Sequence, residues 1–169
     1  STGKSILKCL DLAIRESNSP CAETLWGMIG HAELDQIIRN DFGILNSNIS
    51  NLSSNPNDIA KIMQRFYEHP DIQDPELVAL MFDSFLNQPK TSYDWRRGLP
   101  SGFSEDVKVY NKVGWDWSGS YWKVYHDAAI VDFSSYGRSF IVVVMTSKIK
   151  HQEIGEFAKM LEAEFLDQI

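Results

Sequence analysis

The spacing of hydrophobic residues predicts helices through the first half of the chain. Apolar positions recur three or four residues apart in residues 5–16, which gathers them into one stripe along a helix. The same spacing marks residues 31–42, 57–67 and 76–87, and it returns at 152–166 near the end of the chain. These five segments are therefore expected to be amphipathic helices that each bury one face.

A further short helix is expected at residues 20–29 from its end signals. Pro20 suits a first helical turn, where its missing N–H is not needed. Ser19 is a suitable N-cap, and Gly30 ends the segment. Residues 44–57 are rich in Asn and Ser and predict a long loop that carries at most a short extended piece.

Three runs in the second half of the chain predict β-strands. Residues 108–115, 125–133 and 139–146 are rich in β-branched and aromatic residues and are bounded by turn formers. They are expected to form successive antiparallel strands joined by hairpins. The order of helices, three strands and a final helix indicates a single α+β domain over residues 1–169.

Lys112 lies inside the first of these predicted strands. Because an unpaired buried lysine is costly, two placements are open. Lys112 either points to solvent from an edge strand or lines a cleft where it meets a carboxylate.

Composition narrows the class of partner. With 169 residues and 43% hydrophobic content, the chain is long enough to build a core. A net charge of -7 without any Lys/Arg block argues against nucleic acid and anionic membranes, and favours small molecules or neutral polymers. No apolar run approaches the roughly 20 residues of a membrane span, and no signal peptide is evident. No phosphate-binding loop or metal-ligand spacing occurs, so we expect no cofactor and no metal.

Two further features leave alternatives open. Cys9 and Cys21 show no metal-type spacing, and we interpret them as buried small residues, with a disulfide as the lesser alternative. Aromatic residues crowd the connection between the first two strands and either pack the hairpin or rim a groove that stacks on a sugar or peptide. They are Trp115, Trp117, Tyr121, Trp122 and Tyr125.

The ordered set of motifs resembles the penicillin-recognising serine hydrolases, the superfamily of class A β-lactamases and DD-peptidases. Their signature is S-x-x-K, then S-D-N, then K-T-G. Ser17-Asn18-Ser19 resembles the second element, and Lys112-Val113-Gly114 resembles the third. Residues 98–102 (GLPSG) and 126–131 (HDAAIV) match the family's order and spacing around that strand. The resemblance covers residues 4–148 and implies a partial β-lactamase-like fold.

The resemblance implies a role for each of these residues. Ser17 relays a proton to the leaving group, and Lys112 attracts the substrate's carboxylate. Asn18, Ser19, Val113 and Gly114 become substrate-binding positions, with Gly114 leaving room for a substrate amide along the sheet edge. The implied ligand is a small β-lactam or a peptidoglycan peptide of the D-Ala-D-Ala type, and the implied location is extracytoplasmic.

The sequence also departs from the family pattern. Asn18 and Ser19 replace the aspartate and asparagine of S-D-N, and Val113 removes the threonine hydroxyl of K-T-G. The loop at 44–56 contains no glutamate, so the class A deacylating base is missing.

A suitable nucleophile is also missing from the sequence. Four S-x-x-K strings begin at Ser1, Ser5, Ser120 and Ser147. Ser5 is expected on the same helix as Ser17, roughly 18 Å away along its axis, so the two hydroxyls cannot converge on one carbonyl. The other three do not start a buried helix. We therefore expect the nucleophile's helix, with the first strands of the sheet, to lie on a preceding segment absent from this chain.

Three hypotheses follow. The chain is part of a serine hydrolase that is catalytically incomplete as it stands, or it is a non-catalytic peptide- or peptidoglycan-binding module derived from that fold. The third is an α+β scaffold without a ligand. Because an incomplete sheet leaves an unpaired edge, we also expect self-association.

Overall fold

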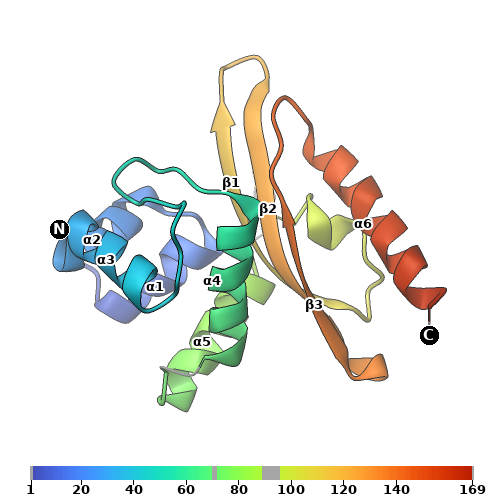
Figure 1. The fold of residues 1–169 in the computed structure, drawn as a ribbon, viewed down its shortest axis with the longest axis horizontal. Helices are drawn as coiled ribbons and strands as arrows, with labels where there is room; N and C mark the ends of the chain where they lie inside the picture. Colours follow the sequence, from blue (N-terminus) through green and yellow to red (C-terminus); the bar gives the residue numbers. More distant parts are fainter. Residues whose placement is uncertain (1, 70–71, 89–95, 169) are drawn as a thin grey trace. The chain divides into compact units, whose positions relative to one another are not determined.

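The computed structural model describes residues 2–69, 72–88 and 96–168 (Figure 1). The chain divides into two compact units, Ser1–Asn87 and Gln88–Ile169. The first unit is helical and the second holds the sheet, so each is described by itself.

Among its described residues the first unit contains five helices; hydrophobic spacing predicts four of them, and end signals predict the one at residues 20–29. Helix α1 contacts α2 and α5, and α2 contacts α3. Each prediction is confirmed to within two residues at either end. The helices are α1 (Ile6–Arg15), α2 (Ser19–Ile29), α3 (His31–Asn40), α4 (Pro56–Glu68) and α5 (Pro75–Leu86).

Polar side chains begin four of these helices. Ser5, Asn18, Asn55 and Asp74 each accept hydrogen bonds from backbone N–H groups of the following first turn. The N-cap of α2 is therefore Asn18, and the expectation that Ser19 caps this helix is wrong. Ser19 is the first helical residue instead, because the amide oxygen of Asn18 reaches the N–H of Cys21 at 3.0 Å.

An ion-pair network fixes the C-terminal end of α1 to α5. Nε of Arg15 lies 2.7 Å from Oδ1 of Asp11, and its Nη2 lies 2.6 Å from Oδ2 of Asp83. Its Nη1 also donates to the carbonyl of Asn87, and Ser84 donates to Asp11. Burial acts to raise the pKa of Asp11, but the hydrogen bonds from Lys8, Arg15 and Ser84 lower it overall. The two helices are thus joined by charge as well as by apolar packing.

The second unit is a three-stranded antiparallel sheet with a helix along one face (Figure 1). The strand order is β1-β2-β3, so β1 and β3 are the edges among the described residues. The predicted α+β class, with helices followed by three strands and a C-terminal helix, is confirmed. The elements are the short 3-10 turn η1 (Leu99–Ser101), β1 (Lys108–Trp117), β2 (Trp122–Phe133), the 3-10 turn η2 (Ser134–Tyr136), β3 (Arg138–Val144) and α6 (His151–Leu166).

The core of this unit lies between the sheet and α6. Alternate residues of each strand face it, as the two-residue repeat of a strand requires. On β1 these are Val109, Asn111 and Val113, all nearly inaccessible. The buried cluster comprises Leu99, Val109, Val113, Tyr125, Ala129, Val131, Phe133, Ile154, Ala158 and Phe165.

The GLPSG segment packs closely on both the sheet and α6. A Cβ on Gly102 would lie 2.0 Å from the carbonyl oxygen of Gly155, and a Cβ on Gly98 would lie 2.2 Å from Oδ2 of Asp127. Glycine is needed at both positions because no side-chain atom fits.

None of the helices in the described residues has the length and apolar character of a membrane span.

Candidate functional site

The outer edge of β1 carries the motif that contains Lys112. Val113 pairs with Asp127 of β2, Lys112 with Ala128 and Gly114 with His126. Residues 112 and 114 therefore share the sheet face that points away from the core. Val113 points the other way and is only 3% exposed, so it can offer a ligand its backbone but not its side chain.

Three side chains hold the backbone carbonyls along this edge. Arg96 Nη1 donates to the carbonyl of Val109 (3.1 Å), and Gln88 Nε2 donates to that of Asn111 (2.5 Å). Lys112 Nζ donates to the carbonyl of Val113 (2.8 Å). Since backbone groups of alternate residues point to the same side of a strand, those of Trp115 face this edge as well. The ammonium of Lys112 thus lies at the carbonyl of Val113, next along the edge to the backbone groups of Trp115.

A buried polar pair lies on the core face of the same strands. Asn111 and Asp127 are 0% and 1% exposed, and Asn111 Nδ2 donates to Asp127 Oδ1 at 3.0 Å. The backbone N–H of Leu99 donates to Asp127 Oδ2 at 2.8 Å, which the missing side chain of Gly98 permits. This network connects β1, β2 and the GLPSG segment. The sequence analysis missed it.

Burial shifts the titration of the two charged groups in opposite directions. Burial lowers the pKa of Lys112 to about 8, and the negative charge of Asp127 acts against this shift. Burial raises the pKa of Asp127 to about 7, against the hydrogen bonds from Asn111 and Leu99 and the charges of Lys112 and Arg96. Near neutral pH, Lys112 is therefore mostly protonated while part of the Asp127 population is neutral.

The junction between α1 and α2 holds the other predicted site residues. Ser17 is half-buried and has a φ of 54°, in the left-handed region that is uncommon for serine. The N–H of Asn18 donates to the carbonyl of Leu12 at 3.1 Å, and Ser19 is exposed. The side-chain oxygen of Asn18 is committed to the cap of α2. Ser17 and Lys112 belong to different units, so their predicted encounter stays a prediction.

Two buried carboxylates shape the Asn- and Ser-rich loop that precedes α4. Asp35 accepts from the N–H of Ile49 (2.6 Å) and from the hydroxyl of Ser50 (2.7 Å), and the Ser50 hydrogen bond lowers its pKa. Asp58 accepts from the N–H of Asn46 and from Ser47 Oγ, at 3.0 and 2.9 Å. A short extended piece is present as the bridge between residues 48 and 53. The loop is therefore ordered by aspartates that the sequence analysis did not single out.

The S-x-x-K strings have other local roles. Ser5 caps α1, while Lys8 pairs with Asp11 at 2.9 Å. Lys123 pairs with Asp116 across the hairpin, and Ser120 lies in its exposed turn. Ser147 bridges to residue 124 and Lys150 precedes α6. Among residues 2–69, 72–88 and 96–168, none of these pairs shows a contact between hydroxyl and ammonium; Ser1 lies outside the described residues.

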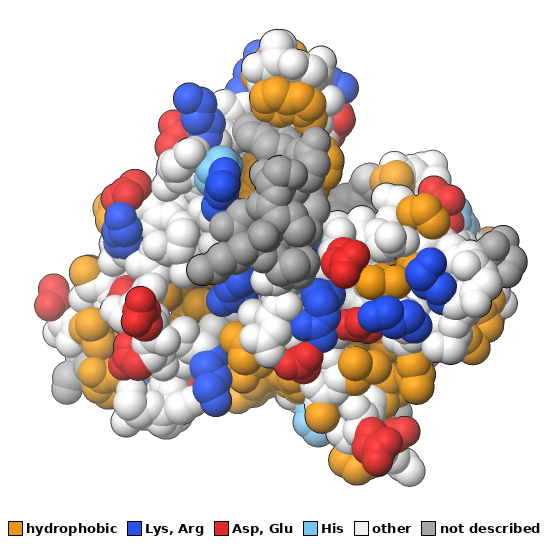
Figure 2. Space-filling view, turned by 180° about the vertical axis from the view of Figure 1, so that it is seen from behind, with side chains coloured by type: hydrophobic (Ala, Val, Ile, Leu, Met, Phe, Trp, Pro, Cys, Tyr) orange, Lys and Arg blue, Asp and Glu red, His pale blue; other side chains and the backbone are white. Residues whose placement is uncertain are grey.

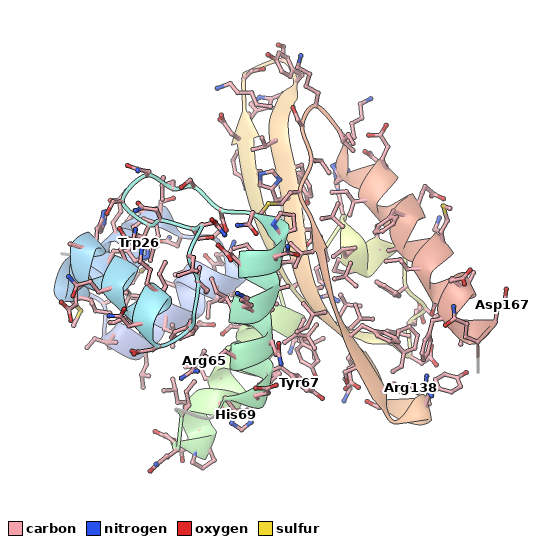
Figure 3. The ribbon with its side chains drawn as sticks, in the orientation of Figure 1. Trp26, Arg65, Tyr67, His69, Arg138 and Asp167 are labelled. Carbon is pink, nitrogen blue, oxygen red and sulfur yellow. The ribbon has the colours of Figure 1, made fainter. Side chains whose placement is uncertain are left out.

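Histidine and acidic residues form no metal site in the described part of the chain. The N–H of Thr146 donates to Nδ1 of His126 (3.0 Å), so a neutral His126 carries its proton on Nε2. Burial lowers its pKa. His31 packs its ring against Trp26 at a centroid distance of 5.6 Å, and Figure 3 labels Trp26 on α2. His31 thus contacts Trp26, whereas Asp35 accepts hydrogen bonds from Ile49 and Ser50, so the two side chains do not share a ligand site.

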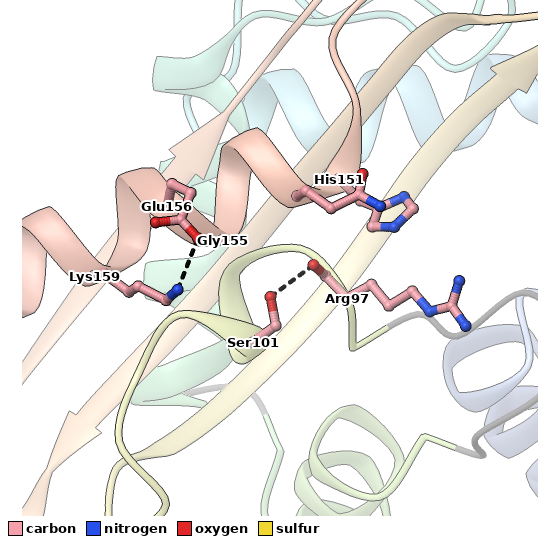
Figure 4. Close-up of a pocket in the computed structure, with 7 residues that line it drawn as sticks. Arg97, Ser101, His151, Gly155, Glu156 and Lys159 are labelled. Carbon is pink, nitrogen blue, oxygen red and sulfur yellow. Dashed lines mark hydrogen bonds and ion pairs between the residues drawn. The ribbon is translucent and has the colours of Figure 1, made fainter.

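Each unit also contains a hollow lined by its own residues. One of about 310 Å³ in the first unit is largely apolar, and Figure 3 shows two of its lining residues, Arg65 and His69, towards the end of α4. One of about 270 Å³ lies between η1 and the start of α6 (Figure 4). There Ser101 donates to the carbonyl of Arg97, and Lys159 pairs with Glu156 at 2.7 Å. Because these polar side chains of the second hollow pair with groups of its own lining, we assign it no ligand.

The surface mixes charges of both signs. On the described part of the face in Figure 2, Lys and Arg side chains lie among Asp and Glu side chains rather than in one basic field.

Comparison with known proteins assigns the family. A sequence model described as the Beta-lactamase enzyme family matches residues 2–164. The chain belongs to this family. The resemblance carried by the Ser17 and Lys112 motifs is thereby confirmed, although the roles of the individual residues are not tested by it. Among curated proteins, no sequence matches the chain significantly.

Solved structures of β-lactamases share the fold. A halotolerant bacterial β-lactamase superposes with a TM-score of 0.78 at 17% identity, covering 98% of this chain and 68% of that one. A variant of the reconstructed class A β-lactamase of the last common ancestor of Gram-negative bacteria gives 0.75 at 21%, covering 100% and 68%. A mutant of PBP-A, solved as its acyl-enzyme complex with penicillin G, gives 0.76 at 21%, covering 97% and 62%. The chain thus spans about two thirds of the length of these β-lactamase-family structures, and the fold is partial.

Proposed function

We propose that this chain is the substrate-binding part of a β-lactamase-like serine hydrolase that acts on β-lactams or on peptides of the D-Ala-D-Ala type. Lys112 carries the proposal, because it places a mostly buried ammonium on the edge strand β1 in a member of this family. Both substrate classes carry a carboxylate, which a desolvated cation attracts strongly.

Each predicted site residue has a proposed role. Lys112 binds the carboxylate, while Gly114 leaves room for the ligand on its open face, where a Cβ would meet nothing within 4 Å. Val113 and Trp115 contribute backbone groups along the edge. Ser17 would relay a proton, and Asn18 and Ser19 would be substrate-binding positions.

We further propose that the acylated serine comes from polypeptide outside this sequence. The local roles of Ser5, Ser120 and Ser147 support this, since none is paired with the lysine of its motif. The 169 residues then form one β-lactamase-like domain together with the missing segment. Like its relatives, the whole protein would act outside the cytoplasm on cell-wall material or antibiotics.

The first prediction concerns covalent chemistry. Incubation of the 169-residue chain with benzylpenicillin, followed by intact-mass spectrometry, is expected to show only the unmodified mass, because in no described S-x-x-K string does the serine hydroxyl contact the lysine ammonium. A PBP known to acylate serves as the positive control. A stable penicilloyl adduct on any serine of this chain would contradict the missing-nucleophile proposal.

The second prediction concerns the pH dependence of binding. The affinity for a carboxylate ligand is expected to fall as the pH rises through about 8, because Lys112 loses its proton there. Calorimetric titration of benzylpenicillin at pH 6.5 and pH 9.5 measures the change. A Lys112→Met variant should lose this pH dependence; an equal affinity of the wild type at both values would count against the assigned role.

A non-catalytic binding module is the second candidate. Trp115, Trp117 and Tyr121 are 37%, 44% and 50% exposed near the end of β1, where they can stack on a sugar or peptide, whereas Tyr125 lies in the core. The family's aspartate, asparagine and threonine are replaced here by Asn18, Ser19 and Val113, and these changes also favour binding without turnover. An S-x-x-K at a helix start in the upstream gene sequence would favour the hydrolase over this module.

We also propose self-association through β3. This strand pairs only with β2 among the described residues. An apolar hollow of about 270 Å³ lies beside it, lined in part by Phe133, Phe140 and Val142. The missing segment would compete with a second copy for the same edge, so supplying that segment in trans should lower the fraction of dimer in sedimentation experiments.

A further inference from the structure

The two cysteines of the chain lie against each other. Cys9 is in α1 and Cys21 is in the first turn of α2, and their sulfurs are 2.7 Å apart, about 0.7 Å more than the ~2.0 Å of a disulfide bond. Both are reduced, and they are 1% and 0% exposed. They are the two cysteines of the 169-residue sequence, so each has the other as its partner within it.

We propose that Cys9 and Cys21 form a reversible disulfide bond that locks the junction between α1 and α2. The residues are twelve positions apart, and the segment between them contains Ser17, Asn18 and Ser19. The bond would therefore close a short covalent loop around the junction. This inference goes beyond the proposed function and does not depend on it.

The junction is the kind of segment that a crosslink would hold. Hydrogen bonds hold its turn, among them those from the N–H of Asn18 to the carbonyl of Leu12 and from the N–H of Cys21 to the side chain of Asn18. Ser17 adopts a left-handed backbone conformation between them. A covalent bond at Cys21 would oppose opening of the first turn of α2, and with it the loss of this conformation.

The two sulfurs differ in a way that suits thiol–disulfide exchange. Its hydrogen bonds with Cys21 and Thr2 lower the pKa of Cys9 against the effect of burial, with Thr2 Oγ1 at 3.3 Å from Cys9 Sγ. Burial raises the pKa of Cys21. Cys9 is therefore the sulfur that ionises first and attacks an oxidant.

The exchange balances with a small-molecule or protein disulfide as the oxidant. The Cys9 thiolate attacks one sulfur of that disulfide and releases its other half as a thiolate. The Cys21 thiolate then attacks the Cys9 sulfur of the mixed disulfide and releases the second half. Two thiols of the chain are oxidised by two electrons, the oxidant is reduced to two thiols, and the two protons pass to the released thiolates. Since both sulfurs are buried, exchange takes place during folding or when the junction opens locally.

The test compares the chain refolded in oxidised and reduced glutathione with the chain refolded in dithiothreitol. We expect the oxidised sample to lose two hydrogens in mass, to show no titratable thiol after denaturation, and to give a crosslinked peptide joining Cys9 and Cys21. Its melting temperature should rise by on the order of 10 °C, and amide exchange at Asn18 and Cys21 should slow. Dithiothreitol should reverse all of these changes.

Cys9→Ser and Cys21→Ser are the matched controls, since neither can form the bond and neither should respond to the oxidant by crosslinking within the chain. If these variants do not fold, the oxidised and reduced wild type still decide the question. Two titratable thiols remaining in the oxidised sample would overturn the proposal. So would glutathione adducts or disulfide-linked dimers as the main products, or an unchanged melting temperature in a crosslinked chain.

Discussion

Replacing Asp127 by alanine is expected to lower the free energy of unfolding by about 3 kcal/mol at pH 5.5. The change leaves two buried donors, Asn111 Nδ2 and the N–H of Leu99, without the carboxyl group that now accepts from them. Each such loss costs roughly 1–3 kcal/mol. Urea denaturation followed by tryptophan fluorescence measures it well, because four of the five tryptophans belong to residues 88–169.

The loss of unfolding free energy caused by Asp127→Ala should be about 2 kcal/mol smaller at pH 7.5 than at pH 5.5. The folded-state pKa of Asp127, about 7, lies above the ordinary value of 3.8, so the folded protein holds this proton more tightly than the unfolded chain. The stability contributed by that proton is fully present at low pH and is lost as the pH rises through about 7. The wild type is therefore less stable at pH 7.5 than at pH 5.5. The difference in unfolding free energy between wild type and Asp127→Ala is correspondingly smaller at pH 7.5.

Asp116→Ala is the matched control for this prediction. Asp116 is on the neighbouring strand, is 55% exposed and pairs with Lys123 at the surface, so its loss should cost under about 0.5 kcal/mol at either pH. An Asp127→Ala cost as small as that of Asp116→Ala, or one that grows with pH, would show that the buried network does not support β1 as described.

Replacing Arg15 by alanine is expected to lower the free energy of unfolding of the first unit by about 2–3 kcal/mol. The guanidinium contacts Asp11, Asp83 and the carbonyl of Asn87, and Asp11 is only 9% exposed. Its removal leaves a mostly buried carboxylate with fewer partners. Denaturation followed by far-ultraviolet circular dichroism, which is dominated by the helices, measures this loss.

Arg15→Lys separates charge from geometry in this network. A lysine keeps the charge but cannot reach three acceptors with one planar group, so it should restore only part of the stability. Lys159→Ala removes an exposed pair on α6 and should cost under about 0.5 kcal/mol. Equal stability of Arg15→Ala and wild type would mean that apolar packing alone joins α1 to α5.

The sequence was sufficient for most helices and strands because they have a periodic apolar pattern or clear end signals; in β2 both faces are buried, and its apolar run marks the strand instead. It was not sufficient to choose between neighbouring polar residues. Asn18 and Ser19 are both good caps, and only the backbone path shows that the Asn18 amide reaches the N–H of Cys21. Likewise, the sequence left open whether Lys112 points to solvent from an edge strand or lines a cleft; it lies on an edge strand, but its side chain is largely buried and donates to the carbonyl of Val113.

The polar pair beneath the site was not predicted from the sequence, for a physical reason. Asn111 and Asp127 occupy core-facing positions in strands whose other core-facing residues are apolar, and polar residues in such runs are usually assigned to the exposed face. The alternation of strand residues could have predicted this burial, because Asn111 lies two residues from both Val109 and Val113 and therefore on the same face of β1. The same alternation separates the Val113 side chain from that of Lys112.

The most direct test of the central claim is calorimetric titration of benzylpenicillin, and of a peptide ending in D-Ala-D-Ala, into wild type and Lys112→Met at pH 6.5. Loss of a charge-assisted contact should weaken binding by roughly 10- to 100-fold. Lys108→Met, an exposed lysine at the start of the same strand, should bind like the wild type. Equal affinities for wild type and Lys112→Met, or no binding by the wild type at millimolar ligand, would contradict a ligand site at the edge of β1.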